Sequence, residues 1–544
     1  SFTGSPAGAL SPASSGSFTA KNVTNQAAIS GYQVVGGFLG NVDNENQPDV
    51  VSFEDCVNHG TVTGSQFGVG GFVGMISGTK NIVVSFSHCT SNATVTVNDK
   101  EVGGFVGYIN ENKNMTMTIT DSVSNSNVSG YICVGGFVGL MYNNYEIKMA
   151  LTNCSNYGKI VGSNASGFVG SVVKDRNELN LEIINCSNNG EIEGGSFIGG
   201  FVGTVTSTWK TKITIAGSSN NEIVHSTSQR IGGFIGFTEL CSHIKVFVSE
   251  SKNNGEITGT SMVGGFVGDI FLNNVIDVSI SNCSNEGQVN GTNSIGGFIG
   301  NIKPSVYSAP VSLLVTNSGN KGQVSAVDGN ACGMFCVEPV DGQNINFTTF
   351  NSINKGNVDA ATNAYGITNI ITSARNVVSM GDVTGKSESF TFWNESTDVE
   401  LFYGMKDKCV SCTNDATLFE YNSCTGFFDD VSNHEHVHTL LNGKAVEQGY
   451  GMMWTKELDL VEHYVEPSSS SFLCSSSSSS LQLSSSLPSS SSQSSSTPSS
   501  SLQPQSQSSS LPSNQSVSSG NQHAASWLSI TIVFILTASF VLNQ

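Results

Sequence analysis

Val69-Gly70-Gly71-Phe72-Val73-Gly74 decides the fold, because the chain repeats this stretch almost literally. A glycine pair, a phenylalanine, an aliphatic residue and a third glycine, which we call the glycine box, return at start-to-start intervals of 31 to 36 residues. Self-similarity at a period of roughly 20–50 residues indicates a solenoid, whose units bury their apolar faces only against their neighbours. The copies, two of them degenerate, begin at Gly36, Gly70, Gly103, Gly135, Ser166, Gly199, Gly232, Gly264, Gly296 and Cys332.

A second motif, Cys-Ser-Asn-x-Gly-x-Val-x-Gly, alternates with the glycine box, as at Cys154–Gly162. Before each copy comes a run of alternating apolar and polar residues, such as Val275–Ile280. Alternation at period two between Gly and Asn clusters predicts strands, and no stretch of the repeats has a helical period. Three short strands per unit, stacked about 4.8 Å apart, predict an all-β fold, a parallel β-helix (solenoid) of about eleven coils with a 32–33-residue period.

The motif residues take structural roles in such a solenoid. The box glycines are expected to allow tight corners and positive φ angles. The box phenylalanines are expected to stack inward, and the motif asparagines to form an amide ladder from coil to coil. The phenylalanine column comprises Phe72, Phe105, Phe137, Phe201, Phe234, Phe266 and Phe298, and the asparagine column comprises Asn58, Asn156, Asn188, Asn220, Asn253, Asn285, Asn320 and Asn354.

The two alternating motifs resemble the GLUG-type repeats of bacterial and protist surface proteins, which also occur beside IgA-specific metalloendopeptidase domains. The likeness covers about residues 20–385. It implies a solenoid of the kind carried by adhesins and surface antigens, and it transfers no catalytic residue.

Composition divides the chain into five parts. Residues 1–19 are an unstructured lead or an incomplete coil, and 20–385 form the solenoid. Residues 386–466, where the repeat fails, are interpreted as a cap over the last coil, whose open strand edge needs cover. Residues 467–521 are a Ser-rich stalk with too little apolar surface to fold, and 522–544 are an apolar tail.

Charge and motif content limit the function. Charged residues make up only 12%, and 42 acidic against 22 basic side chains give a net charge of −20, which opposes nucleic-acid binding. No phosphate-binding loop or nucleophile motif occurs, so we predict no cofactor and no catalytic residue. The leading hypothesis is a non-enzymatic cell-surface protein, an adhesin or surface coat, with an extracellular glycan or a cell-surface protein as its partner.

The rival hypothesis is an extracellular hydrolase. His434-Glu435-His436-Val437-His438 matches His-Glu-x-x-His, in which His434 and His438 would bind zinc and Glu435 would act as general base. No helical pattern surrounds the motif, and under 90 folded residues remain for a catalytic domain. These residues are therefore only weak metal candidates. A carbohydrate-active β-helix is the other version of this hypothesis, although carboxylates are sparse in the boxes.

The chain has thirteen cysteines, nine in the repeats, three in the cap and one, Cys474, in the stalk. Cys409, Cys412 and Cys424 cluster in the cap, and an extracellular setting favours a disulfide among them over a metal knuckle. Cysteines at one repeat position, where other coils have Ser, are predicted to be free core thiols. These are Cys56, Cys89, Cys154, Cys186 and Cys283.

Asn-x-Ser/Thr sequons are frequent, and we expect an occupied subset. Those inside the Cys-Ser-Asn segments, Asn153, Asn185 and Asn282, are expected to be buried. The candidate sites for N-glycosylation are Asn22, Asn92, Asn114, Asn127, Asn164, Asn290, Asn346 and Asn394.

The C-terminal tail predicts membrane attachment at the outer face of the plasma membrane. Trp527–Leu542 is apolar apart from Ser and Thr, and no Lys or Arg follows it. A short apolar stretch after a polar spacer and small residues is typical of a glycosylphosphatidylinositol (GPI) signal, with a transmembrane helix as the alternative. The candidate attachment residues are Ser516, Ser518 and Gly520. Ser1–Ser17 has no secretory signal pattern, so we expect that a signal has been removed or lies upstream.

Phosphatidylinositol-specific phospholipase C is expected to release the protein from intact cells, because a GPI-anchored chain is held only by its lipid. The measurement is an immunoblot of the supernatant with and without the enzyme. Retention on the cells, together with recovery of the C-terminal peptide through Leu542 by mass spectrometry, would instead establish a transmembrane helix.

Overall fold

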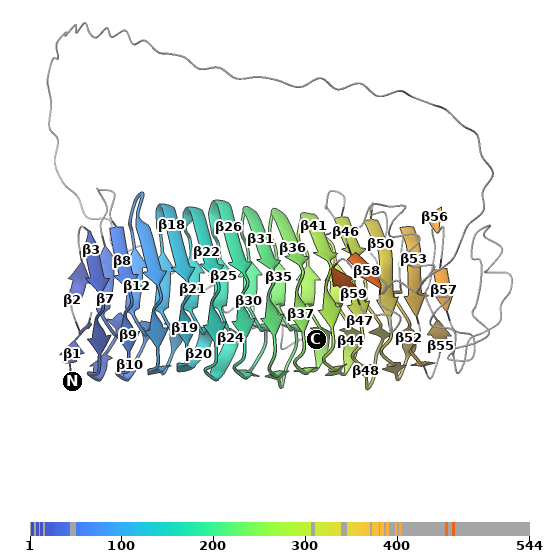
Figure 1. Cartoon of the computed structure of the whole chain (residues 1–544), viewed down its shortest axis with the longest axis horizontal. Helices are drawn as coiled ribbons and strands as arrows, with labels where there is room; N and C mark the ends of the chain where they lie inside the picture. Colours follow the sequence, from blue (N-terminus) through green and yellow to red (C-terminus); the bar gives the residue numbers. More distant parts are fainter. Residues whose placement is uncertain are drawn as a thin grey trace, which may run out of the picture. The chain divides into compact units, whose positions relative to one another are not determined.

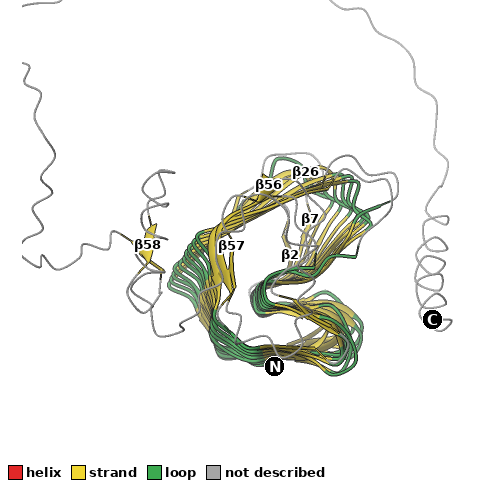
Figure 2. Cartoon of the chain, turned by 90° about the vertical axis from the view of Figure 1, so that its right-hand side faces the viewer, coloured by secondary structure: helices red, strands yellow, loops and turns green. Residues whose placement is uncertain are grey.

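The computed structural model describes residues 2–4, 7–9, 11–14, 17–43, 50–305, 311–338, 345–369, 373–379, 381–385, 388–390, 398–399, 402–404, 452–454 and 460–462. All regular structure in these ranges is strand, and the strands of successive coils pair in parallel (Figure 1). The predicted all-β parallel solenoid is confirmed. Seen along its axis, the coils superpose, and their outline is indented on one side (Figure 2).

In the described ranges three parallel sheets run along the solenoid, which we call sheets A, B and C, with 23, 10 and 24 strands. One coil illustrates the order: β18 (Lys113–Thr120) and β19 (Val123–Ser124) lie in sheet C, β20 (Asn127–Gly135) in sheet A and β21 (Val138–Tyr142) in sheet B. The predicted three strands per unit correspond to these sheets. Sheets A and C are interrupted within most coils, so a unit has up to five strands.

Sheet B contributes one strand to each of ten coils and therefore marks the repeat. Its strands are β2 (Ser11–Ser14), β7 (Leu39–Asp43), β12 (Val73–Ser77), β17 (Val106–Asn110), β21, β25 (Val169–Val173), β30 (Val202–Thr206), β35 (Ile235–Glu239), β40 (Val267–Phe271) and β45 (Ile299–Lys303). The long strands of sheet C are β3 (Phe18–Lys21), β8 (Val50–Glu54), β13 (Val83–Ser87), β18, β22 (Tyr145–Thr152), β26 (Arg176–Ile184), β31 (Lys210–Ala216), β36 (His243–Ser249), β41 (Val275–Ser281), β46 (Val311–Thr316), β50 (Ile345–Asn354) and β53 (Ser373–Ser379).

Parallel pairing extends past both expected ends of the solenoid. Near the N-terminus β1 (Phe2–Gly4) pairs with β5 (Ile29–Gly31), and β2 pairs with β7, as in an incomplete coil. Beyond residue 385, β57 (Phe402–Gly404) pairs with β53. Within the range interpreted as a cap, β58 (Met452–Trp454) and β59 (Leu460–Glu462) form an antiparallel pair.

Each coil encloses two apolar cores. The larger core holds the inward side chains of sheets B and C together with the phenylalanine column. The smaller core holds the inward Val and Ile side chains of sheet A, such as Val128 and Ile160. All predicted phenylalanines are fully buried; Phe38 extends their column at one end, and Phe168 lies within it between Phe137 and Phe201. Neighbouring rings stack with centroids 4.6 to 5.0 Å apart, so the inward assignment is confirmed.

The glycine box separates the two cores, and its glycines are required for space. A Cβ on Gly103 would overlap the carbonyl oxygen of Val106, and a Cβ on Gly107 would overlap the backbone nitrogen of Val69 in the preceding coil. The expectation of positive φ angles in the box is wrong, because the described glycines with positive φ lie elsewhere, at Gly68, Gly78, Gly162 and Gly217. Backbone segments here pack directly on one another, which leaves no room for a side chain.

The asparagine ladder lies beside this close approach. Asn156 Nδ2 donates to Asn188 Oδ1 at 2.9 Å, and the same bond continues through each coil to Asn354. In one coil Asn58 Nδ2 donates to the carbonyl of the box residue Gly71 at 2.7 Å. Ser91 and Ser124 interrupt the column. The predicted ladder is confirmed from Asn156 to Asn354. It gives these buried amides hydrogen-bond partners, apart from Asn156 Oδ1 at its first position, which has none.

Replacing Phe137 by Ala is expected to destabilise the solenoid by about 3–5 kcal/mol, because the ring is fully buried between two stacked neighbours. The measurement is the shift in the midpoint of urea unfolding, which is monitored by circular dichroism. Phe247→Ala is the matched control, since Phe247 lies half-buried on the outward face of β36. Equal losses in the two variants would contradict the inward column.

Candidate functional site

The candidate site lies at the corner where the chain leaves sheet B and enters sheet C. A buried ladder of polar side chains builds this corner. Asn112 donates its backbone N–H to Asn144 Oδ1 at 3.0 Å, and Asn144 donates its own to Asp175 Oδ1 at 2.8 Å. Each bond fixes the corner of one coil against the next. The residue that follows each of these ladder positions is exposed on the outside of the solenoid.

The residues that follow the ladder form an exposed row, which we call the aromatic row: Tyr145, Arg176 and Trp209. Arg176 donates its backbone N–H to the carbonyl of Asn144, and Trp209 donates its own to the carbonyl of Asp175. Trp209 is 56% exposed and Tyr145 is 39% exposed. Since successive coils are about 4.8 Å apart, the two aromatic residues are separated by about 9.6 Å along the row.

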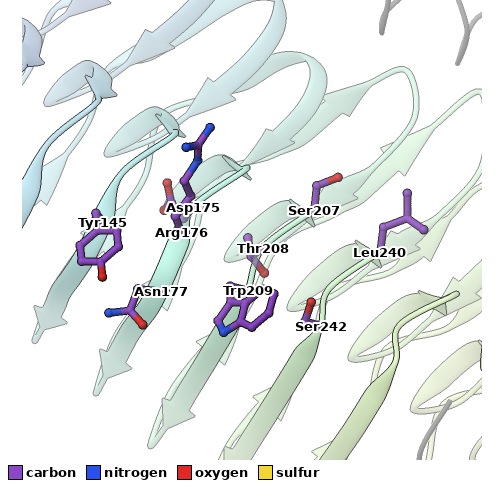
Figure 3. A pocket seen from close by; sticks show the side chains of 9 residues that line it. All are labelled: Tyr145, Asp175, Arg176, Asn177, Ser207, Thr208, Trp209, Leu240 and Ser242. Carbon is purple, nitrogen blue, oxygen red and sulfur yellow. The ribbon is translucent and has the colours of Figure 1, made fainter.

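A shallow groove of about 440 Å³ follows the aromatic row and is open to solvent. Figure 3 shows its side chains at the starts of β22, β26, β31 and β36. Its walls combine aromatic rings, one exposed Leu, and guanidinium, amide and hydroxyl groups. The lining residues are Tyr145, Asp175, Arg176, Asn177, Ser207, Thr208, Trp209, Leu240 and Ser242.

Asp175 is the unusual member of the corner ladder. Its Oδ1 accepts from Asn144, whereas its Oδ2 is buried without a hydrogen-bond partner. In the two preceding coils the corresponding atom is an amide nitrogen, with which Asn112 donates to the carbonyl of Ile76 and Asn144 to that of Ile109. Burial raises the pKa of the Asp175 carboxyl to about 6, against the opposing effect of the bonds from Asn144.

Arg230 and Asp269 form an ion pair in which the carboxylate is buried and both of its oxygens have protein partners. Arg230 Nε donates to Asp269 Oδ2 at 2.9 Å, and Asn301 Nδ2 donates to Asp269 Oδ1 at 3.0 Å. The guanidinium also lies over the ring of Phe237, with its carbon 4.2 Å from the ring centroid. Because both carboxylate oxygens have protein partners, we interpret this group as structural.

Several sites predicted from the sequence lie outside the described residues. In the part of the chain that the structure describes, no group of three or more His, Cys, Asp or Glu side chains could hold a metal ion. The described ranges also contain no helix long and apolar enough to cross a membrane. The predictions outside those ranges are His434, Glu435, His438, Cys409, Cys412, Cys424, Asn394, Ser516, Ser518 and Gly520.

The described sequon asparagines are exposed or half-buried. Asn164 and Asn290 are half-buried, whereas the other described candidates, Asn22, Asn92, Asn114, Asn127 and Asn346, are exposed. The expected burial of Asn153 and Asn185 is wrong, and Asn282 is half-buried. All three occupy a corner with φ near +55°, and this left-handed corner turns the side chain outward while the Cys that follows points inward.

The five cysteines of the repeat position are buried and free, as are Cys133 and Cys241. Among the cysteines that the structure describes, Cys332 and Cys336 form a disulfide. These two residues occupy the first and last glycine positions of the degenerate box, where Cys332 pairs in register with Gly296. Their Cα atoms lie 5.5 Å apart, so the tight reversal of the box brings its two ends within disulfide reach.

The aromatic row was not among the predicted sites, although the sequence carries a signal for it. Tyr145, Arg176 and Trp209 each follow the first residue of their glycine box by ten positions. Trp209 is also the single tryptophan within the repeat region.

No protein-family model, curated protein or solved structure matches the chain. The class of protein therefore rests on the fold, a parallel β-solenoid with an exposed aromatic groove.

Asp175→Asn is expected to stabilise the protein above pH 6 and to remove part of its pH dependence. The Asp175 carboxyl has a higher pKa in the folded state than in the unfolded state. The stability that this difference contributes is fully present at a pH below the unfolded-state pKa, and it is lost as pH rises through about 6. The loss corresponds to about 3 kcal/mol. An asparagine supplies the amide donor found in the neighbouring coils.

The measurement is the urea midpoint of both proteins between pH 4 and pH 8. Asp121→Asn, at an exposed corner, is the control for removing a carboxylate without changing the ladder. A variant that is less stable than the parent at pH 8 would show that the ionised carboxylate has a stabilising partner.

Proposed function

We propose that the chain is a non-enzymatic cell-surface protein that acts in adhesion or as a surface coat. On this proposal the solenoid is carried on the Ser-rich stalk, bears N-linked glycans and is attached to the membrane through a GPI anchor. The resemblance to GLUG-type repeats supports the proposal, as do the stalk and tail compositions.

The single observation that carries the proposal is the exposure of Tyr145 and Trp209 at a position of the repeat that has no recurring residue type. Phenylalanines, box glycines and asparagines recur because the core and the backbone contacts need them. These phenylalanine and asparagine side chains are buried, so they are not accessible to a ligand on the surface. The aromatic row, in contrast, breaks the repeat on the outside of the solenoid, and its large exposed rings contribute little to the fold. Exposed aromatic side chains on a rigid scaffold favour recognition of a partner.

Cells that display the full-length protein are expected to label with antibody without permeabilisation and to adhere to target cells better than cells lacking it. The measurement is adherent cells per field after washing. Normal adhesion by cells from which the protein has been deleted would contradict the proposed adhesive role.

Glu435→Gln serves as the control for the rival peptidase hypothesis. The adhesive proposal expects this variant to adhere like the parent. Proteolysis by the parent protein that is abolished in this variant, with adhesion lost in parallel, would favour the hydrolase.

A further inference from the structure

We propose that the groove along the aromatic row binds an extended glycan, whose sugar rings stack on Tyr145 and Trp209. This inference rests on the proposed surface function and names its ligand class. It also assigns the binding site to the four coils that begin at β22, β26, β31 and β36.

The first argument is the chemistry of the exposed rings. One face of a pyranose ring carries mainly C–H groups, which pack on the face of an indole or phenol ring while the hydroxyls stay in water. Trp209 and Tyr145 are exposed by 56% and 39%, and apart from Leu240 the other side chains that line the groove are polar or charged. Aromatic side chains of this kind combine an apolar body with a polar end, which suits an amphipathic ligand.

The second argument is the spacing along the row. Tyr145 and Trp209 occupy equivalent positions two coils apart, about 9.6 Å, and Arg176 lies between them. The regular rise of the solenoid therefore holds two stacking platforms at a fixed separation. Two platforms with one residue between them match an extended β-linked chain in which one ring stacks, the next is bonded by its hydroxyls and the third stacks again.

The third argument is the set of polar groups that line the groove beside the rings. Arg176 and Asn177 lie on the coil between the two platforms, and Ser207 and Ser242 flank Trp209. Guanidinium and amide groups donate to vicinal hydroxyls in pairs. Asp175 lies beneath these groups at the base of the groove, and its Oδ2 is buried without a hydrogen-bond partner.

The shape of the groove favours a glycan over a peptide. Peptide-binding grooves enclose apolar side chains in pockets or add a strand to a free sheet edge. Here the groove is shallow and open, and β22, β26 and β31 are already paired on both sides. A ligand that lies across the coils and contacts rings by its flat faces meets these conditions.

The test is isothermal titration of the purified full-length protein with β1,4-linked hexasaccharides, one neutral (chitohexaose) and one uronate-rich (mannuronate hexamer). Binding of at least one is expected, and comparison of the two identifies the charge of the ligand. The trisaccharide is the shortest chain expected to bind, because a disaccharide cannot reach both platforms. Failure of the parent protein to bind either hexasaccharide would overturn the proposal.

Trp209→Ala and Tyr145→Ala are each expected to weaken binding at least tenfold, and Trp209→Phe to retain part of it. Tyr157→Ala is the matched control, because Tyr157 is also 56% exposed but lies away from the row. Circular dichroism of each variant checks the fold. Equal affinity of the parent and the Tyr145/Trp209 double variant, or equal loss in Tyr157→Ala, would contradict the site.

The cell assay separates failure of this site from failure of the proposed function. Loss of adhesion in the double variant supports both proposals together. Adhesion that persists in the double variant, with glycan binding absent from the parent, rejects the site and leaves the adhesive function standing. Glycan binding by a protein that never labels at the cell surface supports the site and rejects the surface function.

Discussion

Direct contact between backbone segments at the glycine box is the constraint on which the structure depends. Sheet A and sheet B meet there so closely that a single methyl group on Gly103 or Gly107 would overlap backbone atoms. This approach divides each coil into two cores and sets the path by which the chain enters sheet B. The disulfide between Cys332 and Cys336 occurs at the same reversal, and it replaces glycine contact with a covalent link.

The stacking of coils follows from that constraint. Once each box turns in the same way, the phenylalanines fall into a column and the asparagines into a ladder, each residue meeting its equivalent in the next coil. Apolar burial and amide hydrogen bonds are therefore shared between neighbours only, as in other one-dimensional repeat proteins. A buried amide is tolerated because the adjacent coil supplies its partner.

The candidate site shows how the outer surface of a repeat protein can differ from coil to coil while the core stays regular. The corner ladder uses Asn112 and Asn144 in two coils and then Asp175, which cannot donate as they do. The residue after each ladder position points outward whatever its type, because the ladder bonds its neighbour. Substitution at this outward position changes the surface without disturbing the core, and a tyrosine and a tryptophan there cost the fold little.

The sequence by itself determined the period, the strand content, the inward phenylalanines and the asparagine ladder, because these depend on patterns that repeat along the chain. It also placed Arg176 and Trp209 at one offset from the box. Only the tertiary structure decided why the box needs glycine, since the clash of Gly107 is with Val69, nearly forty residues earlier. The same holds for the exposure of Asn153, the unpartnered oxygen of Asp175 and the groove along the aromatic row. Each of these depends on how closely two coils approach and which way a corner turns, and neither distance nor direction is present in a local pattern of residues.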